Sequence, residues 1–330
     1  LLSKDYLDAL RINHGEYYAL ILLATSGMVL LVAATDMILL FLGLEIMSIP
    51  IYVLAGFDRR KLRSNESALK YFLVGSFASA LLLYGMALLY GATGHTDLAG
   101  IRAGFDPSSS LAMIGLGLLL VGFTFKISSV PFHQWTPDVY EGAPTSVTAY
   151  MSVTVKVAAF VALLRVVVEA LGAPPPAMTE VLAVLAALTL IIGNFVAVVQ
   201  DNVKRMLAYS SIAHAGYLLI GFVTATSEAY AAVLFYLLVY VFMNLGAFAV
   251  IVALAHQGRD TERIEDFSGL ASVRPGLAAA MTLFMLALAG IPGTGGFVAK
   301  FLLFQAAVNE GVILLTILGV LTSVVSVYYY

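Results

Sequence analysis

The chain has 330 residues, of which 61% are hydrophobic and only 11% are charged. Soluble domains carry about 25% charged residues, so the composition excludes an ordinary soluble protein and is typical of a chain that crosses a membrane many times. The formal net charge of -3 gives no indication of nucleic-acid binding. Because cysteine is absent, this chain holds no disulfide, no thiolate-bound iron–sulfur cluster and no cysteine zinc site.

Ten apolar runs are long enough to cross a bilayer as helices, which pair all their backbone polar groups internally. They cover residues 16–35, 36–57, 67–92, 110–130, 144–169, 179–200, 203–225, 228–256, 275–310 and 312–330. None alternates polar and apolar residues as a barrel strand does. The predicted fold class is therefore an all-α polytopic membrane protein. Because the chain starts at Leu1 and its last run has no polar flank, we expect a fragment of a longer protein.

The fourth and ninth runs are interrupted. Ser128-Ser129-Val130-Pro131 and a polar stretch end the fourth run, and the glycine-rich segment 290–296 divides the ninth. Proline and glycine weaken a helix, and interrupted segments at matching places in two halves indicate a transporter built from repeats. We therefore predict two five-helix repeats, residues 1–170 and 171–330, with the second inverted. Two unrelated kinks are the alternative.

Most basic residues lie on one predicted side of the membrane. The side on which the first span starts collects eleven: Lys4, Arg11, Arg59, Arg60, Lys61, Arg63, Lys204, Arg205, Arg259, Arg263 and Arg274. The other side has two, Arg102 and Arg165. An excess of lysine and arginine marks the cytoplasmic side, so we predict that the first span starts there.

Four lysines remain, and all lie inside apolar runs: Lys70, Lys126, Lys156 and Lys300. A lysine at the centre of a membrane helix costs about 2.5–3.5 kcal/mol on insertion scales, which points to a function. Burial disfavours the charged form of lysine and a nearby carboxylate favours it, so a buried lysine can take up and release protons. Glu45 is the one carboxylate near the centre of a span. A structural ion pair or snorkelling to the interface is the alternative, above all for Lys70.

Two histidines accompany these lysines. His133 lies in the polar interruption after Lys126, and His214 lies within the seventh run, where a packing role is the alternative. The five histidines are scattered without paired ligand spacing, so we expect no metal site. Neither a glycine-rich dinucleotide motif nor a phosphate loop is present, which gives no indication of a nucleotide site.

Four stretches together resemble the antiporter-like subunits of respiratory complex I, the NADH–quinone oxidoreductase. They are GLEIMSIPIYVL around Glu45, GFTFKISSVPFHQWTPDVYEGAPTSVTAYMSVTVK from Gly122 to Lys156, QDNVKRMLAYSSIAHAGYLL from Gln200, and GIPGTGGFVAKFLLF around Lys300. The resemblance covers essentially the whole chain. It implies a larger subunit of about fourteen helices, with an inverted pair of five-helix repeats that each contain a broken helix.

The resemblance also implies a proton-translocating role for individual residues. Glu45 would tune Lys126, Lys156 would bridge the two repeats, and Lys300 would be the counterpart of Lys126 near the exit. Lys70, His133 and His214 would lie along the same axis.

The resemblance implies that flavin, iron–sulfur clusters and quinone belong to partner subunits, with no cofactor in this chain. Its partners would be neighbouring antiporter-like subunit M, small membrane subunits and lipids, in the inner (plasma) membrane of a bacterium. A subunit of a multisubunit sodium/proton antiporter and a structural membrane scaffold are the alternative functions.

Overall fold

The computed structural model describes residues 2–255 and 262–330, and these form an all-helical protein whose only extended pairings are isolated bridges. In chain order the helices are α1 (Leu2–Leu10), α2 (Gly15–Ala33), α3 (Met37–Ala55), α4 (Leu62–Thr93), α5 (Leu98–Gly104), α6 (Ser110–Lys126), α7 (Trp135–Gly142), α8 (Thr145–Arg165), the π-helical η1 (Val166–Leu171), α9 (Pro176–Ala197), α10 (Val203–Thr224), α11 (Ser227–Leu254), the 3-10 helix η2 (Ile264–Phe267), α12 (Leu270–Val273), α13 (Pro275–Ala289), α14 (Gly295–Asn309) and α15 (Ile313–Tyr329).

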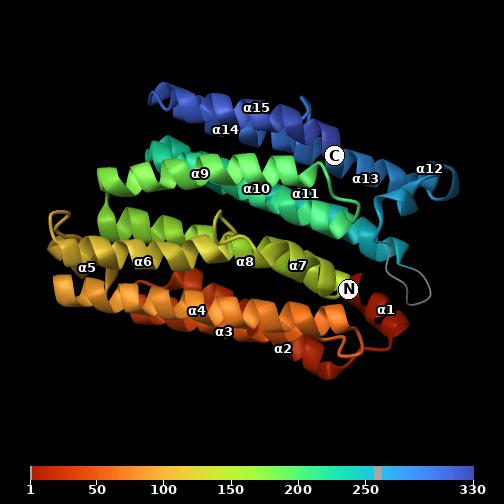
Figure 1. Cartoon of the computed structure of the whole chain (residues 1–330), viewed down its shortest axis with the longest axis horizontal. Coiled ribbons are helices and arrows are strands. Elements are labelled where there is room, and N and C mark those ends of the chain that lie inside the picture. The colour runs from red at the N-terminus through yellow and green to blue at the C-terminus, as the bar shows by residue number, and fades with distance from the viewer. Residues whose placement is uncertain (1, 256–261) are drawn as a thin grey trace.

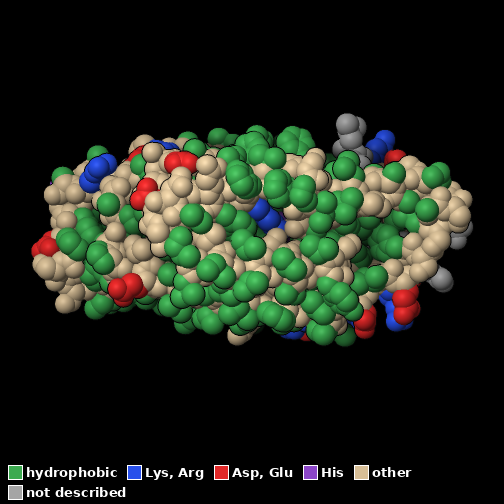
Figure 2. All heavy atoms as spheres, turned by 90° about the horizontal axis from the view of Figure 1, so that it is seen from above, with side chains coloured by type: hydrophobic (Ala, Val, Ile, Leu, Met, Phe, Trp, Pro, Cys, Tyr) green, Lys and Arg blue, Asp and Glu red, His purple; other side chains and the backbone are tan. Residues whose placement is uncertain are grey.

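The long helices lie side by side along one axis (Figure 1). α2, α3, α4 and α6 occupy one half of the molecule, and α9, α10, α11, α14 and α15 occupy the other. α8 lies between the halves and contacts both α2 and α11. Figure 2 shows hydrophobic side chains over much of one face, with charged side chains mostly toward the two ends and a basic side chain visible in a central hollow. An apolar middle with charged ends is the pattern of a protein that spans a bilayer.

Seven described helices are long and apolar enough to cross a membrane: α2, α3, α4, α8 continued by η1, α9, α10 and α11. They confirm seven of the predicted spans as continuous helices, with boundary shifts of a few residues. The largest shift is at the start of the third span, because α4 begins at Leu62 instead of residue 67. The predicted end of the eighth span at residue 256 lies outside the described residues.

The ninth span is divided into two helices, as the sequence predicted, and the fourth span ends at the predicted interruption, which a short helix follows. α6 ends at Lys126 and α7 begins at Trp135, so part of the stretch predicted as a polar interruption is itself helical. Thr189 of α9 accepts a hydrogen bond from Val130 N at 3.0 Å, and Trp135 Nε1 donates to Phe125 O at 3.2 Å. These neighbours satisfy backbone groups that the break leaves unpaired, which is what irregular backbone at membrane depth requires.

The second break separates α13 from α14 at Gly290 and Gly293. Both have positive φ angles, 83° and 95°, which glycine adopts without steric cost. Thr294 then caps α14 by accepting a hydrogen bond from Phe297 N.

Lys126 precedes the first break, whereas Lys300 follows the second one, so the two lysines are not placed alike relative to their breaks.

The helix order places the two predicted groups of basic residues at opposite ends of the molecule. At one end Arg60 reaches Leu10 O, and Arg274 reaches Ala253 O. At the other end Arg165 donates to Val32 O, and Arg102 lies beside the end of η1. Arg259, which the sequence assigned to the basic end, lies outside the described residues.

Candidate functional site

Lys126 is buried at the end of α6, about halfway along the molecule. Its Nζ donates to Ser48 Oγ at 2.6 Å and to Tyr52 OH at 3.2 Å, both on α3. The same ammonium lies 5.7 Å from the ring centroid of Tyr71 on α4. The side chain is therefore surrounded by neutral hydroxyl groups and aromatic rings, which accept or attract an ammonium without neutralising it.

Glu45 lies one turn before Ser48 on α3, yet no ion pair joins it to Lys126 in the described part of the chain. Its Oε1 is buried and has no hydrogen-bond partner there. A buried carboxylate oxygen without a donor is costly, and such sites commonly hold water or exchange protons. Glu45 is thus placed to influence Lys126 through space without holding it in a fixed pair.

Lys156 is buried in the middle of α8 and is held by a single residue of α10. Its Nζ donates to Ser211 O at 2.6 Å and to Ser211 Oγ at 2.5 Å. Tyr240 OH of α11 donates to the same Oγ at 2.9 Å, and Tyr140 OH of α7 lies 3.5 Å from it. Ser211 of α10 is therefore contacted by polar side chains of three other helices, α7, α8 and α11, beside one buried ammonium.

His214 follows Ser211 by one helical turn, so both side chains project from the same face of α10. His214 Nδ1 lies 2.7 Å from Tyr236 OH, and its Nε2 lies 3.1 Å from Tyr330 OH. A hydroxyl both donates and accepts, so these partners satisfy either neutral tautomer as well as the charged imidazolium. The ring can change its protonation state here without leaving a nitrogen unpaired.

Lys300 is buried on α14 and reaches back to the end of α13. Its Nζ donates to Leu288 O at 3.2 Å, to Ala289 O at 2.9 Å and to Ser323 Oγ of α15 at 2.9 Å. It also lies 4.8 Å from the ring centroid of Tyr217 on α10. Like the other two buried lysines of the central region, it meets neutral acceptors and no carboxylate among the described residues.

A series of hydrogen bonds and ring contacts connects His214 to Lys300. The Tyr330 ring lies against that of Tyr329, whose hydroxyl donates to Asn194 Oδ1 at 3.0 Å. Asn194 Nδ2 in turn donates to Tyr217 OH at 3.4 Å, and the ring of Tyr217 lies against the Lys300 ammonium. Sequence reasoning missed these connecting residues. The signal was weak, because a polar side chain within an apolar run is also common in helix packing.

The link from Lys126 to Lys156 is mainly aromatic. Tyr71 stacks on Trp135 with ring centroids 4.2 Å apart, and Trp135 contacts Tyr140 at 6.5 Å. Tyr140 then places its hydroxyl near Ser211. Only the last of these contacts brings two polar atoms together, so the described side chains give no continuous hydrogen-bonded route between the two lysines.

Lys70 lies apart from this central group, toward the basic end of α4. Its Nζ pairs with Asp138 Oδ2 at 2.8 Å and with Glu66 Oε1 at 2.7 Å, and 44% of its side chain is exposed. This is the structural ion pair that the sequence left open as the alternative for Lys70.

His133 lies in the turn before α7, and its Nδ1 is buried without a partner in the described chain.

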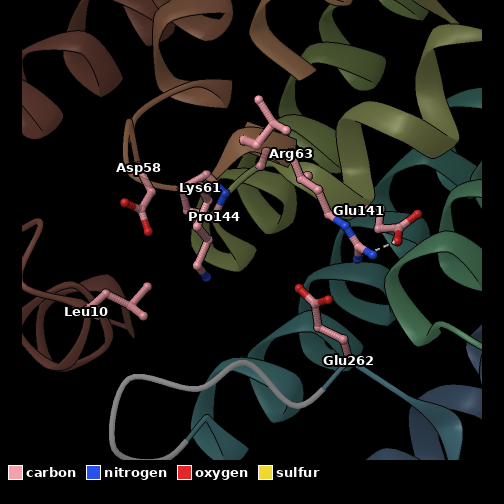
Figure 3. Close-up of a pocket in the computed structure, with 10 residues that line it drawn as sticks. Leu10, Asp58, Lys61, Arg63, Glu141, Pro144 and Glu262 are labelled. Atoms are coloured by element: carbon pink, nitrogen blue, oxygen red, sulfur yellow. Dashed lines mark hydrogen bonds and ion pairs between the residues drawn. The ribbon is translucent and has the colours of Figure 1, made fainter. Parts of the chain in front are cut away.

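The basic end contains a charged pocket of about 560 Å³ that includes Lys61, Arg63, Glu141 and Glu262 (Figure 3). In Figure 3, Arg63 points toward Glu141, and their atoms are 3.1 Å apart. Beside this pocket, Arg205 of α10 pairs with Asp138 and Glu141 of α7 at 2.8 and 3.0 Å. α7 is therefore fastened to α4 and α10 by ion pairs.

The sequence placed Lys204 among the surface residues of this end, but the structure buries it almost completely, with 1% of the residue exposed. Its Nζ donates to Glu141 O at 2.8 Å and to Ala143 O at 2.7 Å, at the end of α7. Glu262 Oε1 lies 3.5 Å away. It was missed because it stands beside Arg205 at the start of an apolar run, where basic residues usually face water.

No group of three or more histidine, aspartate or glutamate side chains suited to a metal occurs among residues 2–255 and 262–330. The lysine, histidine, tyrosine and serine side chains described above carry groups that can donate and accept protons.

Comparisons with known proteins agree with this arrangement. The family model described as NADH:quinone oxidoreductase/Mrp antiporter, TM, matches residues 34–326. NADH-quinone oxidoreductase subunit N of Trichlorobacter lovleyi is 53% identical over 334 residues, which cover 100% of this chain and 69% of that protein. A solved structure of respiratory complex I from Thermus thermophilus with bound aureothin matches with a TM-score of 0.85 and 44% identity, over 96% of this chain and 69% of the matched chain.

A solved structure of the Mrp complex from a Dietzia species also matches, with a TM-score of 0.86 and 28% identity over 94% of this chain and 58% of the matched one. Both structural matches extend over nearly the whole of this all-helical chain. The chain belongs to the NADH:quinone oxidoreductase/Mrp antiporter family of transmembrane proteins.

Proposed function

We propose that this chain is a proton-translocating membrane-arm subunit of NADH–quinone oxidoreductase, in the position that its relatives name subunit N. The observation that carries the proposal is the group of three buried lysines in the central region, Lys126, Lys156 and Lys300, each held by neutral acceptors. A buried ammonium without a fixed counter-ion is expensive in a membrane, which supports a role in charge transfer.

In this proposal protons enter from the basic, cytoplasmic end and pass along Lys126, Lys156, His214 and Lys300. Glu45 acts on Lys126 through its charge, and His133 lies on the uptake side. Quinone reduction elsewhere in the complex drives the rearrangement of charge. Residues 1–170 and 171–330 act as two inverted repeats that meet between Lys156 and His214. Lys70 contributes an ion pair at the end of the path.

The same proposal assigns electron transfer to other subunits, because this chain has no cysteine and no nucleotide motif. Flavin, iron–sulfur clusters and quinone are bound by those partners. Subunit M and small membrane subunits are the proposed neighbours. The membrane is the inner (plasma) membrane of a bacterium, which agrees with the bacterial relatives.

Reconstitution of the assembled complex tests the role of Lys126. Lys126→Ala removes the ammonium, so proton pumping per NADH oxidised should fall while the complex still assembles. Lys4→Ala, an exposed lysine on α1, is the matched control and should pump as the wild type does. A pH-sensitive dye in proteoliposomes measures pumping, and native electrophoresis measures assembly. Full pumping by Lys126→Ala would contradict the assigned role.

Two alternatives are separated by further measurements. A sodium/proton antiporter subunit is supported by the structural likeness to the Mrp complex, and it predicts sodium-dependent proton flux without flavin and iron–sulfur subunits. A structural scaffold predicts that lysine substitutions damage assembly but leave the pumping stoichiometry of assembled complexes unchanged. Co-purification with redox subunits and the pumping ratio of assembled Lys126→Ala complexes decide between the three.

A further inference from the structure

A second hollow at the basic end lies between the start of α2 and the end of α3. It has a volume of about 790 Å³, and its lining includes Arg11, Arg59, Leu20, Val53 and Phe57. The two arginines come from the turns that flank the helices. Leu20 and Val53 lie inside α2 and α3, so the apolar wall extends below the charged rim. At 1.5 Å per residue, this wall reaches about one helical turn into the membrane.

The two rim arginines lack partners, unlike their neighbour. In residues 2–255 and 262–330, no ion pair or hydrogen bond engages the guanidinium of Arg11 or of Arg59. Arg60, by contrast, donates to Asp58 Oδ1 at 3.1 Å and to Leu10 O at 2.5 Å. Two exposed guanidinium groups therefore remain available to an anion at the mouth of the hollow.

The remaining charges of the lining leave a small positive excess. Asp58 is buried and engaged by Arg60, and Glu16 is the other carboxylate of the lining. Arg11, Arg59 and Arg60 against Asp58 and Glu16 give three positive and two negative charges, which leaves one positive charge. A ligand with one negative charge at the rim and an apolar body below matches both the charge and the lining.

We propose that this hollow binds an anionic phospholipid of the cytoplasmic leaflet. The phosphodiester lies between Arg11 and Arg59, and an acyl chain lies along Leu20 and Val53. A guanidinium binds phosphate oxygens through paired N–H donors, and basic pockets between membrane helices on the cytoplasmic side suit acidic headgroups. The lipid would fasten α1 and the α3–α4 turn to the membrane surface.

Photocrosslinking of the assembled complex tests this proposal. The complex is placed in phosphatidylcholine nanodiscs that contain a phosphatidylglycerol analogue with a photoreactive group on one acyl chain. Crosslinks to peptides of α2 and α3 are then quantified by mass spectrometry. Each basic residue near an anionic headgroup contributes a factor of about five to affinity. In the Arg11→Gln/Arg59→Gln double variant, the lipid concentration that gives half-maximal crosslinking should therefore be about 25-fold higher.

Arg102→Gln, at the opposite end of the molecule, is the control and should crosslink as the wild type does. Dioleoylphosphatidylglycerol should compete for the site, whereas inorganic phosphate in the buffer should not. Unchanged crosslinking in the double variant would overturn the proposal. Competition by inorganic phosphate would show a free-anion site instead, and equal competition by phosphatidylethanolamine would show that the anionic headgroup is not what is recognised.

Discussion

Replacement of Lys204 by methionine tests how α7 is held in place. Lys204 is buried and donates to the backbone carbonyls of Glu141 and Ala143, where α7 ends. Methionine keeps most of the stem volume but has no donor, so both carbonyls lose their partner. The ammonium of Lys204 also lies 3.5 Å from Glu262, and that ion pair disappears as well.

The size of the effect follows from burial. A buried carbonyl left without a donor costs about 1–3 kcal/mol, which applies to Ala143 O, whereas Glu141 O is partly buried and loses less. Removal of the buried charge offsets part of this loss of stability, because the ammonium no longer has to be desolvated. We therefore expect α7 to be destabilised by about 2 kcal/mol. The equilibrium constant for local opening of α7 should therefore increase by about 30-fold.

Hydrogen–deuterium exchange of the assembled complex measures this opening in peptides that cover residues 135–144. Arg63→Met is the matched control, because Arg63 pairs with Glu141 through a side chain that is 72% exposed. Exposed ion pairs contribute about 0–1 kcal/mol, so exchange should rise by no more than about fivefold in this variant. Equal acceleration in both variants, or none in Lys204→Met, would refute the argument that burial decides the strength of these contacts.

Two further substitutions have clear expectations. Gly296→Ala should lower the thermal stability of the complex, because a Cβ there would overlap with Ala287 O at the second break. In Gly276→Ala the added Cβ meets nothing within 4 Å, so this variant should be neutral in the same melting experiment. His214→Ala should lower the pumping rate, because it removes the ring that joins Tyr236 and Tyr330. His95→Ala, in an exposed loop, should leave the pumping rate unchanged. Equal pumping in both histidine variants would exclude His214 from the path.

The long helices were predictable because membrane spans are specified by local composition. Seven continuous helices and both interruptions lie where the apolar runs placed them. The short helix α7 was not predicted, because its eight residues mix polar side chains with Trp135, Val139 and Tyr140 and are too few to form an apolar run. Helix packing cannot be seen in a window of neighbouring residues.

The candidate site was predictable for isolated charges and less so for their partners. Lys126, Lys156 and Lys300 stand out because an ionisable residue inside an apolar run is rare. Ser211 and Asn194 do not stand out, since serine and asparagine are tolerated in such helices, and their role depends on which helix faces them. Lys204 was predicted to lie at the surface and is buried, because α7 covers it and its neighbours in the sequence give no sign of this.

The two helix breaks have a consequence for the charge on the lysines. Lys126 lies in the last turn of α6, and Lys300 donates to the last carbonyls of α13. The carboxyl-terminal end of a helix carries about half a negative charge from its aligned peptide dipoles. Each break thus creates such an end in the interior, beside a lysine. Unlike a carboxylate, a peptide dipole does not titrate, so this attraction on the ammonium stays constant at every pH at which the fold persists.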